Sequence, residues 1–227
     1  MTDCIWRAIA RAITSQPRMV DWLIRRAKRT PYSPITSQDG LSIYMDRWWL
    51  FNPYGKDDEG NTTPARWEWL PSIRIHHIRR PDSDRHLHDH PWNARTIVLR
   101  GWYFEERPVP ALSDRELLSA IDFVDGKEAR AVLWREKGYT GRLLFGQYHR
   151  ISNLHRDGVW TLFFTRKELG EWGFEVDGRK VPSKEDLGRR SQHTRGRGRR
   201  HSSEPRHVNP GPSGRRWQPR AKGRAND

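Results

Sequence analysis

Between residues 41 and 181 the chain alternates short segments rich in Ile, Val, Leu, Trp, Phe and Tyr with clusters of turn-forming residues. β-Branched and aromatic side chains favour strands, whereas Gly, Pro, Asn and Asp favour the turns between them. The segments expected as strands are 41–51, 72–78, 96–105, 131–134, 142–144, 159–166 and 173–176. Regularly spaced short strands are typical of a sandwich or barrel. The pattern therefore predicts an all-β barrel over residues 40–182.

Two stretches depart from this pattern and are predicted as helix. Residues 4–29 repeat apolar residues at helical spacing, and Pro17 is expected to break or kink the run. The opposite side is basic, so residues 1–39 are either an amphipathic segment that rests on a membrane or nucleic acid, or short helices packed on the barrel. Ser113 with Glu116 three residues later predicts an N-cap and a helical insert with apolar residues up to Ile121.

The net charge of +14 belongs to the two ends of the chain. Residues 1–30 carry seven Lys or Arg against two acidic residues, and residues 188–227 carry twelve against two, so the centre is near neutral. The stretch 183–227 has almost no aliphatic residues and is predicted to be a disordered basic tail. Its run from Arg195 to Arg200 resembles arginine-glycine segments that bind RNA or DNA, although a solvated tail is the simpler interpretation.

Composition also bears on the compartment. Cys4 is the one cysteine, so no disulfide can form within the chain, which suits a reducing environment. No run of about 18 apolar residues predicts a transmembrane helix, and Arg7, Arg11 and Arg18 interrupt any secretory signal at the N-terminus. These features predict a cytoplasmic protein.

The stretch His86-Leu-His88-Asp-His90 places three histidines at alternate positions. On a strand, alternate side chains share a face, where three imidazoles are poor core if neutral and repel one another if charged. A divalent metal explains the arrangement, since neutral imidazole is a good ligand for Fe(II), Zn, Ni or Mn. Three neighbours on one strand rarely reach one ion, so two of the three are expected to ligate and His86 is the weakest candidate.

A second segment strengthens that interpretation. Gly138, Gly146, His149 and Asn153 follow one another at spacings that match the second motif of the cupin superfamily, with Leu144 where that motif has a proline. The first cupin motif is matched by His88, His90 and Gly101, whereas Asp82 replaces its leading glycine and Ala94 its glutamate ligand. The chain therefore resembles RmlC-like jelly-roll cupins. It also looks like a group of uncharacterised cupin-domain proteins of bacteriophages and bacteria in the stretches His88-Asp-His-Pro-Trp92, Leu99-Arg-Gly101, Glu105-Glu106, His149-Arg150, Trp160-Thr-Leu162 and Trp172-Gly-Phe174.

The resemblance implies a single jelly-roll barrel in which His88, His90 and His149 meet one ion. Cupins with three histidines and no glutamate exist among thiol dioxygenases, which bind Fe(II) and use dioxygen. Glu105 or Glu106 is the candidate to replace the missing carboxylate, because Asp89 should face away from its histidine neighbours on a regular strand. Tyr103 is expected to share a face with Glu105 and to donate a hydrogen bond to a substrate, so these two are the candidate catalytic residues.

Three functions remain open on the sequence alone. The first is a metal-dependent enzyme acting on a small molecule, with dioxygenase-like or isomerase-like chemistry. The second is a non-catalytic cupin that binds a small ligand or a structural metal. The third is a nucleic-acid-associated accessory protein that acts through residues 188–227. Arg74, Arg95 and Arg150 are candidate anchors for an anionic substrate, one of His76 and His77 should point into the barrel, and exposed strand edges make a homodimer a candidate assembly.

Overall fold

The computed structural model describes residues 2–36, 41–59, 62–82, 86–124 and 129–183. The predicted tail therefore lies outside the described residues from position 184 onward, and so does the predicted boundary between residues 39 and 40. The described residues all belong to one compact unit. Within the described ranges no helix is long and apolar enough to cross a membrane.

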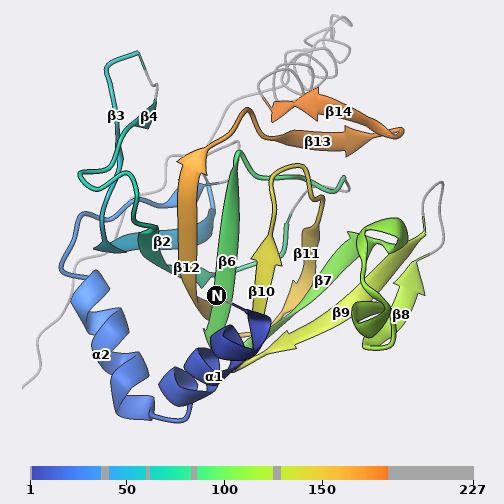
Figure 1. The fold of residues 1–227 in the computed structure, drawn as a ribbon, viewed down its shortest axis with the longest axis horizontal. Coiled ribbons are helices and arrows are strands. Elements are labelled where there is room, and N and C mark those ends of the chain that lie inside the picture. Colours follow the sequence, from blue (N-terminus) through green and yellow to red (C-terminus); the bar gives the residue numbers. More distant parts are fainter. Residues whose placement is uncertain (1, 37–40, 60–61, 83–85, 125–128, 184–227) are drawn as a thin grey trace, which may run out of the picture. The chain divides into compact units, whose positions relative to one another are not determined.

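Two antiparallel sheets make up most of the fold (Figure 1). The six-stranded sheet has the order β1 (Ile35–Thr36), β2 (Ile43–Phe51), β5 (Ser72–Ile78), β12 (Val159–Glu168), β6 (Trp92–Arg100) and β10 (Thr140–Leu143). The four-stranded sheet has the order β11 (Arg150–Leu154), β7 (Trp102–Pro108), β9 (Arg130–Glu136) and β8 (Ala120–Val124). Two hairpins complete the strands: β13 (Gly173–Val176) with β14 (Arg179–Pro182), and β3 (Gly55–Lys56) with β4 (Thr62–Thr63).

Side-chain alternation gives the six-stranded sheet two different faces. One row across β2, β5, β12 and β6 is apolar: Trp48, Ile75, Leu162 and Ile97. The next row along the same strands is mostly polar: Arg47, His76, Thr161 and Val98. Because neighbouring residues of a strand point to opposite faces, the two rows lie on opposite sides of the sheet.

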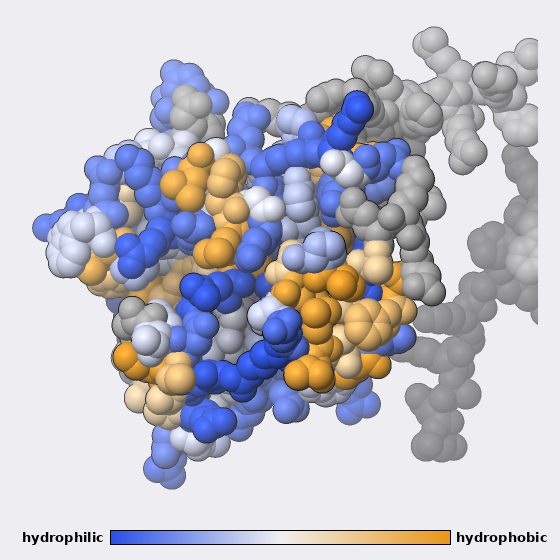
Figure 2. All heavy atoms as spheres, turned by 45° about the vertical axis from the view of Figure 1, so that its right-hand side comes forward, coloured by the Kyte–Doolittle hydropathy of each residue, from blue (hydrophilic) through white to orange (hydrophobic). Residues whose placement is uncertain are grey.

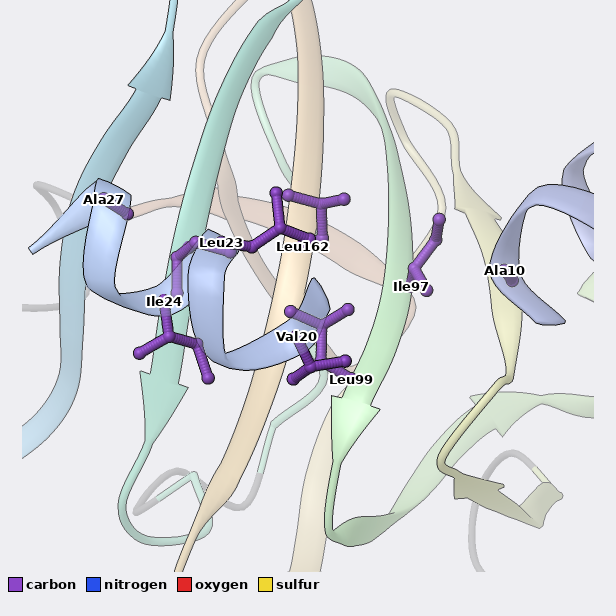
Figure 3. Packing of buried hydrophobic residues seen from close by; sticks show 9 residues of the cluster. Ala10, Val20, Leu23, Ile24, Ala27, Ile97, Leu99 and Leu162 are labelled. Atoms are coloured by element: carbon purple, nitrogen blue, oxygen red, sulfur yellow. The ribbon is translucent and has the colours of Figure 1, made fainter. Parts of the chain in front are cut away.

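The apolar face is covered by the N-terminal helices α1 (Asp3–Thr14) and α2 (Pro17–Ala27), as Figure 3 shows. Val20, Leu23 and Ile24 of α2 pack with Ile75 and Leu162 in one buried cluster. Each such side chain contributes about 1.5–3 kcal/mol when it leaves water. The structure thus favours the interpretation of the N-terminal segment as short helices packed on the sheet. Pro17 is the first residue of α2, a position where its missing N–H costs no hydrogen bond.

The other face of the six-stranded sheet meets the four-stranded sheet. A second cluster takes Ile78, Val98 and Val159 from the first sheet and Tyr103 and Ile151 from the second. One core shared by two antiparallel sheets confirms the predicted all-β class.

Three details of the sequence prediction were wrong. The expected strand 96–105 is two strands, because Gly101 turns the chain from one sheet to the other with a φ of +82°. The helical insert is the single turn α3 (Asp114–Leu117), preceded by the 3-10 turn η1 (Val109–Ala111). Its capping box at Ser113 and Glu116 forms as predicted, but Ile121 lies on β8. Strands β8 and β11 were not predicted at all.

Strand β8 is an edge of the four-stranded sheet and is apolar on its outside. Ile121 and Phe123 of this strand are 54% and 52% exposed. Figure 2 shows apolar side chains gathered in patches on the face of the molecule that it presents.

Candidate metal centre

The backbone itself brings His88 and His149 together. Each residue donates its N–H to the carbonyl of the other, at 2.9 Å in both directions, and this reciprocal pair forms an antiparallel bridge. Partners in such a bridge project their side chains to the same face. The two distant motifs therefore meet by main-chain hydrogen bonding before any side chain is considered.

The three predicted imidazoles converge. Candidate ligand atoms of His88, His90 and His149 all lie within 4.8 Å of one another. The Nε2 atoms of His90 and His149 are 2.9 Å apart, so one carries a proton and the other accepts it. Nitrogens bound to one tetrahedral ion at usual bond lengths are separated by about 3.4 Å. The cluster thus has nearly the spacing that a shared cation requires.

Asp89 holds the histidine segment from behind. Its carboxylate is fully buried and accepts hydrogen bonds from the backbone N–H of Gly173, at 2.7 Å, and from the Lys180 ammonium, at 2.5 Å. Both donors belong to the β13–β14 hairpin, which also pairs through Phe174 with His88. As predicted, Asp89 points away from its histidine neighbours, and its role is to attach the hairpin beneath them.

Glu105 lies behind His149, on the side away from the cluster. Its Oε1 accepts a hydrogen bond from Nδ1 of His149 at 3.0 Å and from Arg107 at 3.0 Å, and its Oε2 accepts one from Arg135 at 2.8 Å. With a proton on Nδ1, the His149 ring presents the lone pair of Nε2 to the cluster. A carboxylate in this position fixes the orientation of a metal-binding imidazole and raises its basicity.

Comparison with known proteins gives matches of structure alone. No family model and no curated protein matches the chain. Among solved structures, the Fe(II) form of HppE is 11% identical and covers 61% of this chain and 57% of its own, with a TM-score of 0.37. A variant of oxalate decarboxylase from Bacillus subtilis is 12% identical, at a TM-score of 0.36, and covers 63% of this chain and 29% of its own. An RmlC-like cupin from Ralstonia eutropha is 13% identical, with a TM-score of 0.36; the match covers 78% of this chain and 88% of that protein.

The two facing antiparallel sheets and the N-terminal helices bear out the all-β class predicted from the sequence. The chain spans 57% of HppE and 29% of the decarboxylase, so it covers little more than half of the first and under a third of the second.

The charge around the candidate metal centre suits a cation. Burial, followed by the nearby His149 and His88, lowers the pKa of His90 well below 6.5, so its ring is neutral at neutral pH. Burial by itself raises the pKa of Glu105, but the charges of Arg107 and Arg135 outweigh it and hold that carboxyl well below its usual pKa. Neutral imidazoles in front and an ionised carboxylate behind form a donor set that fits a divalent ion.

The other candidate residues lie apart from the cluster. His86 is half-buried and outside the group of converging nitrogens. Tyr103 packs in the core between the sheets, where burial raises its pKa well above 10 and keeps the phenol protonated. Glu106 faces Arg130 and Arg150, at 3.6 and 3.8 Å. None of these contacts tests the catalytic role of Tyr103, which stays a prediction.

Sequence reasoning missed the two arginines that hold Glu105. Arg107 and Arg135 are each only 5% exposed, which is rare for arginine unless it is paired. Position 107 is two residues after 105 and therefore shares its face, a signal that was available in the sequence. No local pattern pairs Arg135 with Glu105, because they are 30 positions apart on neighbouring strands.

Proposed function

We propose that this protein is a metal-dependent enzyme acting on a small molecule, with one divalent cation held by His88, His90 and His149. The observation that carries the proposal is the 2.9 Å contact between Nε2 of His90 and Nε2 of His149, buttressed from behind by Glu105. His88, His90 and His149 would hold the cation through ring nitrogens that then carry no proton. The donors are imidazole nitrogens, which suit Fe(II), Zn, Ni or Mn.

The chain's own residues have distinct tasks in this proposal. His149 is held in one tautomer by Glu105, which Arg107 and Arg135 keep ionised. Asp89 and the β13–β14 hairpin fix the segment that carries His88 and His90. A bound divalent ion supplies a Lewis acid with coordination positions left for water or substrate. Glu105 thus acts as a positioning residue, while Tyr103 remains the candidate donor to a substrate.

Metal content tests the proposal directly. The wild type is expected to purify with, or to bind after reconstitution, close to one equivalent of a transition metal. The double variant H88A/H149A should lose it, whereas H86A is the matched control from the same segment and should retain it. Wild-type protein that binds none of Fe(II), Zn(II), Ni(II) or Mn(II) at micromolar concentration contradicts the proposal.

Turnover separates an enzyme from a binding protein. Oxygen consumption by the Fe(II)-loaded protein with candidate thiols supports a dioxygenase, whereas stoichiometric metal without turnover on any substrate favours a ligand-binding cupin. A steep salt dependence of DNA or RNA binding that disappears on truncation after residue 187 supports the accessory role of the basic stretch. A cytoplasmic location and a homodimer stay predictions alongside these.

A further inference from the structure

Three nitrogen-bearing side chains lie together on the polar face of the six-stranded sheet. Arg47 of β2 is directly opposite His76 of β5, and Arg74 of β5 is one row further along, opposite Trp49. Residues 47, 74 and 76 alternate with the apolar row that faces the helices, so all three point towards the second sheet. Side chains directly opposite on adjacent strands have Cβ atoms about 5 Å apart, close enough to contact one molecule.

The two arginines have no acidic partner among the described residues. Arg47 donates from Nε to the Ser33 carbonyl, at 3.0 Å, and from Nη2 to the Ser33 hydroxyl, at 3.3 Å. Arg74 stacks on aromatic rings, 3.9 Å from the centroid of Trp49 and 4.6 Å from that of Tyr54. Burial, with the nearby charge of Arg74, lowers the pKa of Arg47 to about 10, so its guanidinium group still carries its charge at neutral pH.

The arginines behind the candidate metal centre are arranged differently. Arg107 and Arg135 lie against Glu105, at 3.0 and 2.8 Å, so their charge is compensated within the protein. Arg47 and Arg74 are half-buried, and the contacts described above are with neutral groups. A half-buried pair of like charges is costly unless something negative joins it.

His76 adds a buried polar atom with no partner. The residue is 6% exposed, and its Nε2 atom makes no hydrogen bond within the structure. Burial, with the charges of Arg74 and Arg47, lowers its pKa well below 6.5, so the ring is neutral and has an N–H to donate in one tautomer. Buried polar groups are almost always satisfied, so this N–H is available to donate to a bound molecule.

His76 lies one aromatic residue away from the histidine cluster. The ring of His76 is 4.8 Å from that of Phe163, and the ring of Phe163 is 6.3 Å from that of His90. One aromatic ring therefore separates His76 from the candidate metal centre.

We propose that Arg47, Arg74 and His76 form a subsite for an oxyanion group, a carboxylate or a phosphoryl group, at one end of the substrate. The subsite rests on the proposed function only in that the other end of the molecule reaches the three-histidine cluster. Guanidinium forks match the oxygens of either group, and Trp49 and Tyr54 shield the Arg74 contact from water.

Anion titration of metal-free protein tests the subsite. Protein stripped with a chelator is titrated calorimetrically with inorganic phosphate and, separately, with malonate; the stronger binder identifies which oxyanion the site takes. Saturable binding of about one equivalent is expected, and R47Q and R74Q should each weaken it roughly tenfold or more, the effect of losing a charged hydrogen-bond partner. R166Q, which removes one charge from an exposed position of β12, should change the affinity less than twofold.

The outcomes separate this subsite from the metal centre. No saturable binding of either anion by the wild type, or an equal loss in R166Q, overturns the subsite whatever the metal analysis shows. H88A/H149A should bind the anion like the wild type, so a protein that fails to bind metal can still retain the subsite. Where R47Q or R74Q is misfolded by circular dichroism, R47K and R74K keep the charge but lose the fork, and unchanged affinity in folded lysine variants also refutes the assignment.

Discussion

Replacing Glu105 by Gln perturbs the candidate site most sharply with the smallest change in shape. The carboxylate is 2% exposed and accepts three hydrogen bonds, from Arg107, Arg135 and His149. Glutamine has one carbonyl oxygen for those three donors, and its NH₂ group faces one of them. Two nearly buried guanidinium groups are left with Glu116, which is 3.7 to 3.8 Å away, as their only remaining carboxylate in the described structure.

The expected cost follows from those contacts. Removing one partner of a buried ion pair costs about 3–5 kcal/mol, because the opposite charge stays buried without compensation. For a domain of this size each kcal/mol lowers the Tm by about 2–4 °C, so E105Q should melt roughly 6–20 °C below the wild type. Loss of the carboxylate behind His149 should also weaken metal binding about 10- to 100-fold.

The pH dependence gives a second signature. The pKa of Glu105 is lower in the folded chain than its ordinary value of 4.5, so its stabilising contribution is complete above that value and is lost as pH falls towards the folded pKa. The difference in unfolding free energy between wild type and E105Q should therefore be constant above about pH 5 and narrow on further acidification.

Urea unfolding, followed by tryptophan fluorescence, and competitive metal titration measure both effects. E106Q is the matched control: its carboxylate lies in looser ion pairs, at 3.6 and 3.8 Å, so its replacement should cost less stability than E105Q and leave metal affinity unchanged. An E105Q protein that loses less than about 1 kcal/mol and binds metal within twofold of wild type would falsify the assignment of Glu105 as the residue that orients His149.

Three further changes test other parts of the fold. D89N leaves Lys180 without its carboxylate and should cost about 1–3 kcal/mol in urea unfolding while weakening metal binding; an unchanged affinity means that the hairpin does not position the histidines. G101A should cost about 1–3 kcal/mol, because its φ is +82° and the added Cβ meets a backbone carbonyl at 2.7 Å, whereas G146A, with positive φ but open space, should cost less; equal costs contradict the steric argument. His76 is neutral in the folded protein, so acidification from pH 7.5 to 5.5 protonates this residue only in the unfolded chain. The free energy of unfolding of the wild type should therefore fall by about 1 kcal/mol more than that of H76Q over this range. Chemical denaturation at the two pH values measures the difference.

Local sequence patterns determined the class of fold and the pair of histidines on one segment. The two-residue period of strands such as 72–78 and 159–166 sorts their side chains onto two faces, and the bounds observed for β5 and β12 agree closely with the prediction. His88 and His90 also point to one side and Asp89 to the other, although their segment precedes β6 and forms only an isolated bridge at His88 instead of the expected strand. Capping at Ser113 is equally local, and it formed as expected.

Register between distant strands decided the rest. His90 and His149 are 59 positions apart, and Glu105 and His149 are 44 positions apart. The local sequence around each residue therefore does not predict which distant residue it will contact. The turn at Gly101 sends β7 to the second sheet, and its pairing there with β11 and β9 brings Glu105 beneath His149 and beside Arg135. A strand's period tells which face a side chain takes, whereas only the hydrogen-bonded alignment of neighbouring strands tells what that side chain meets.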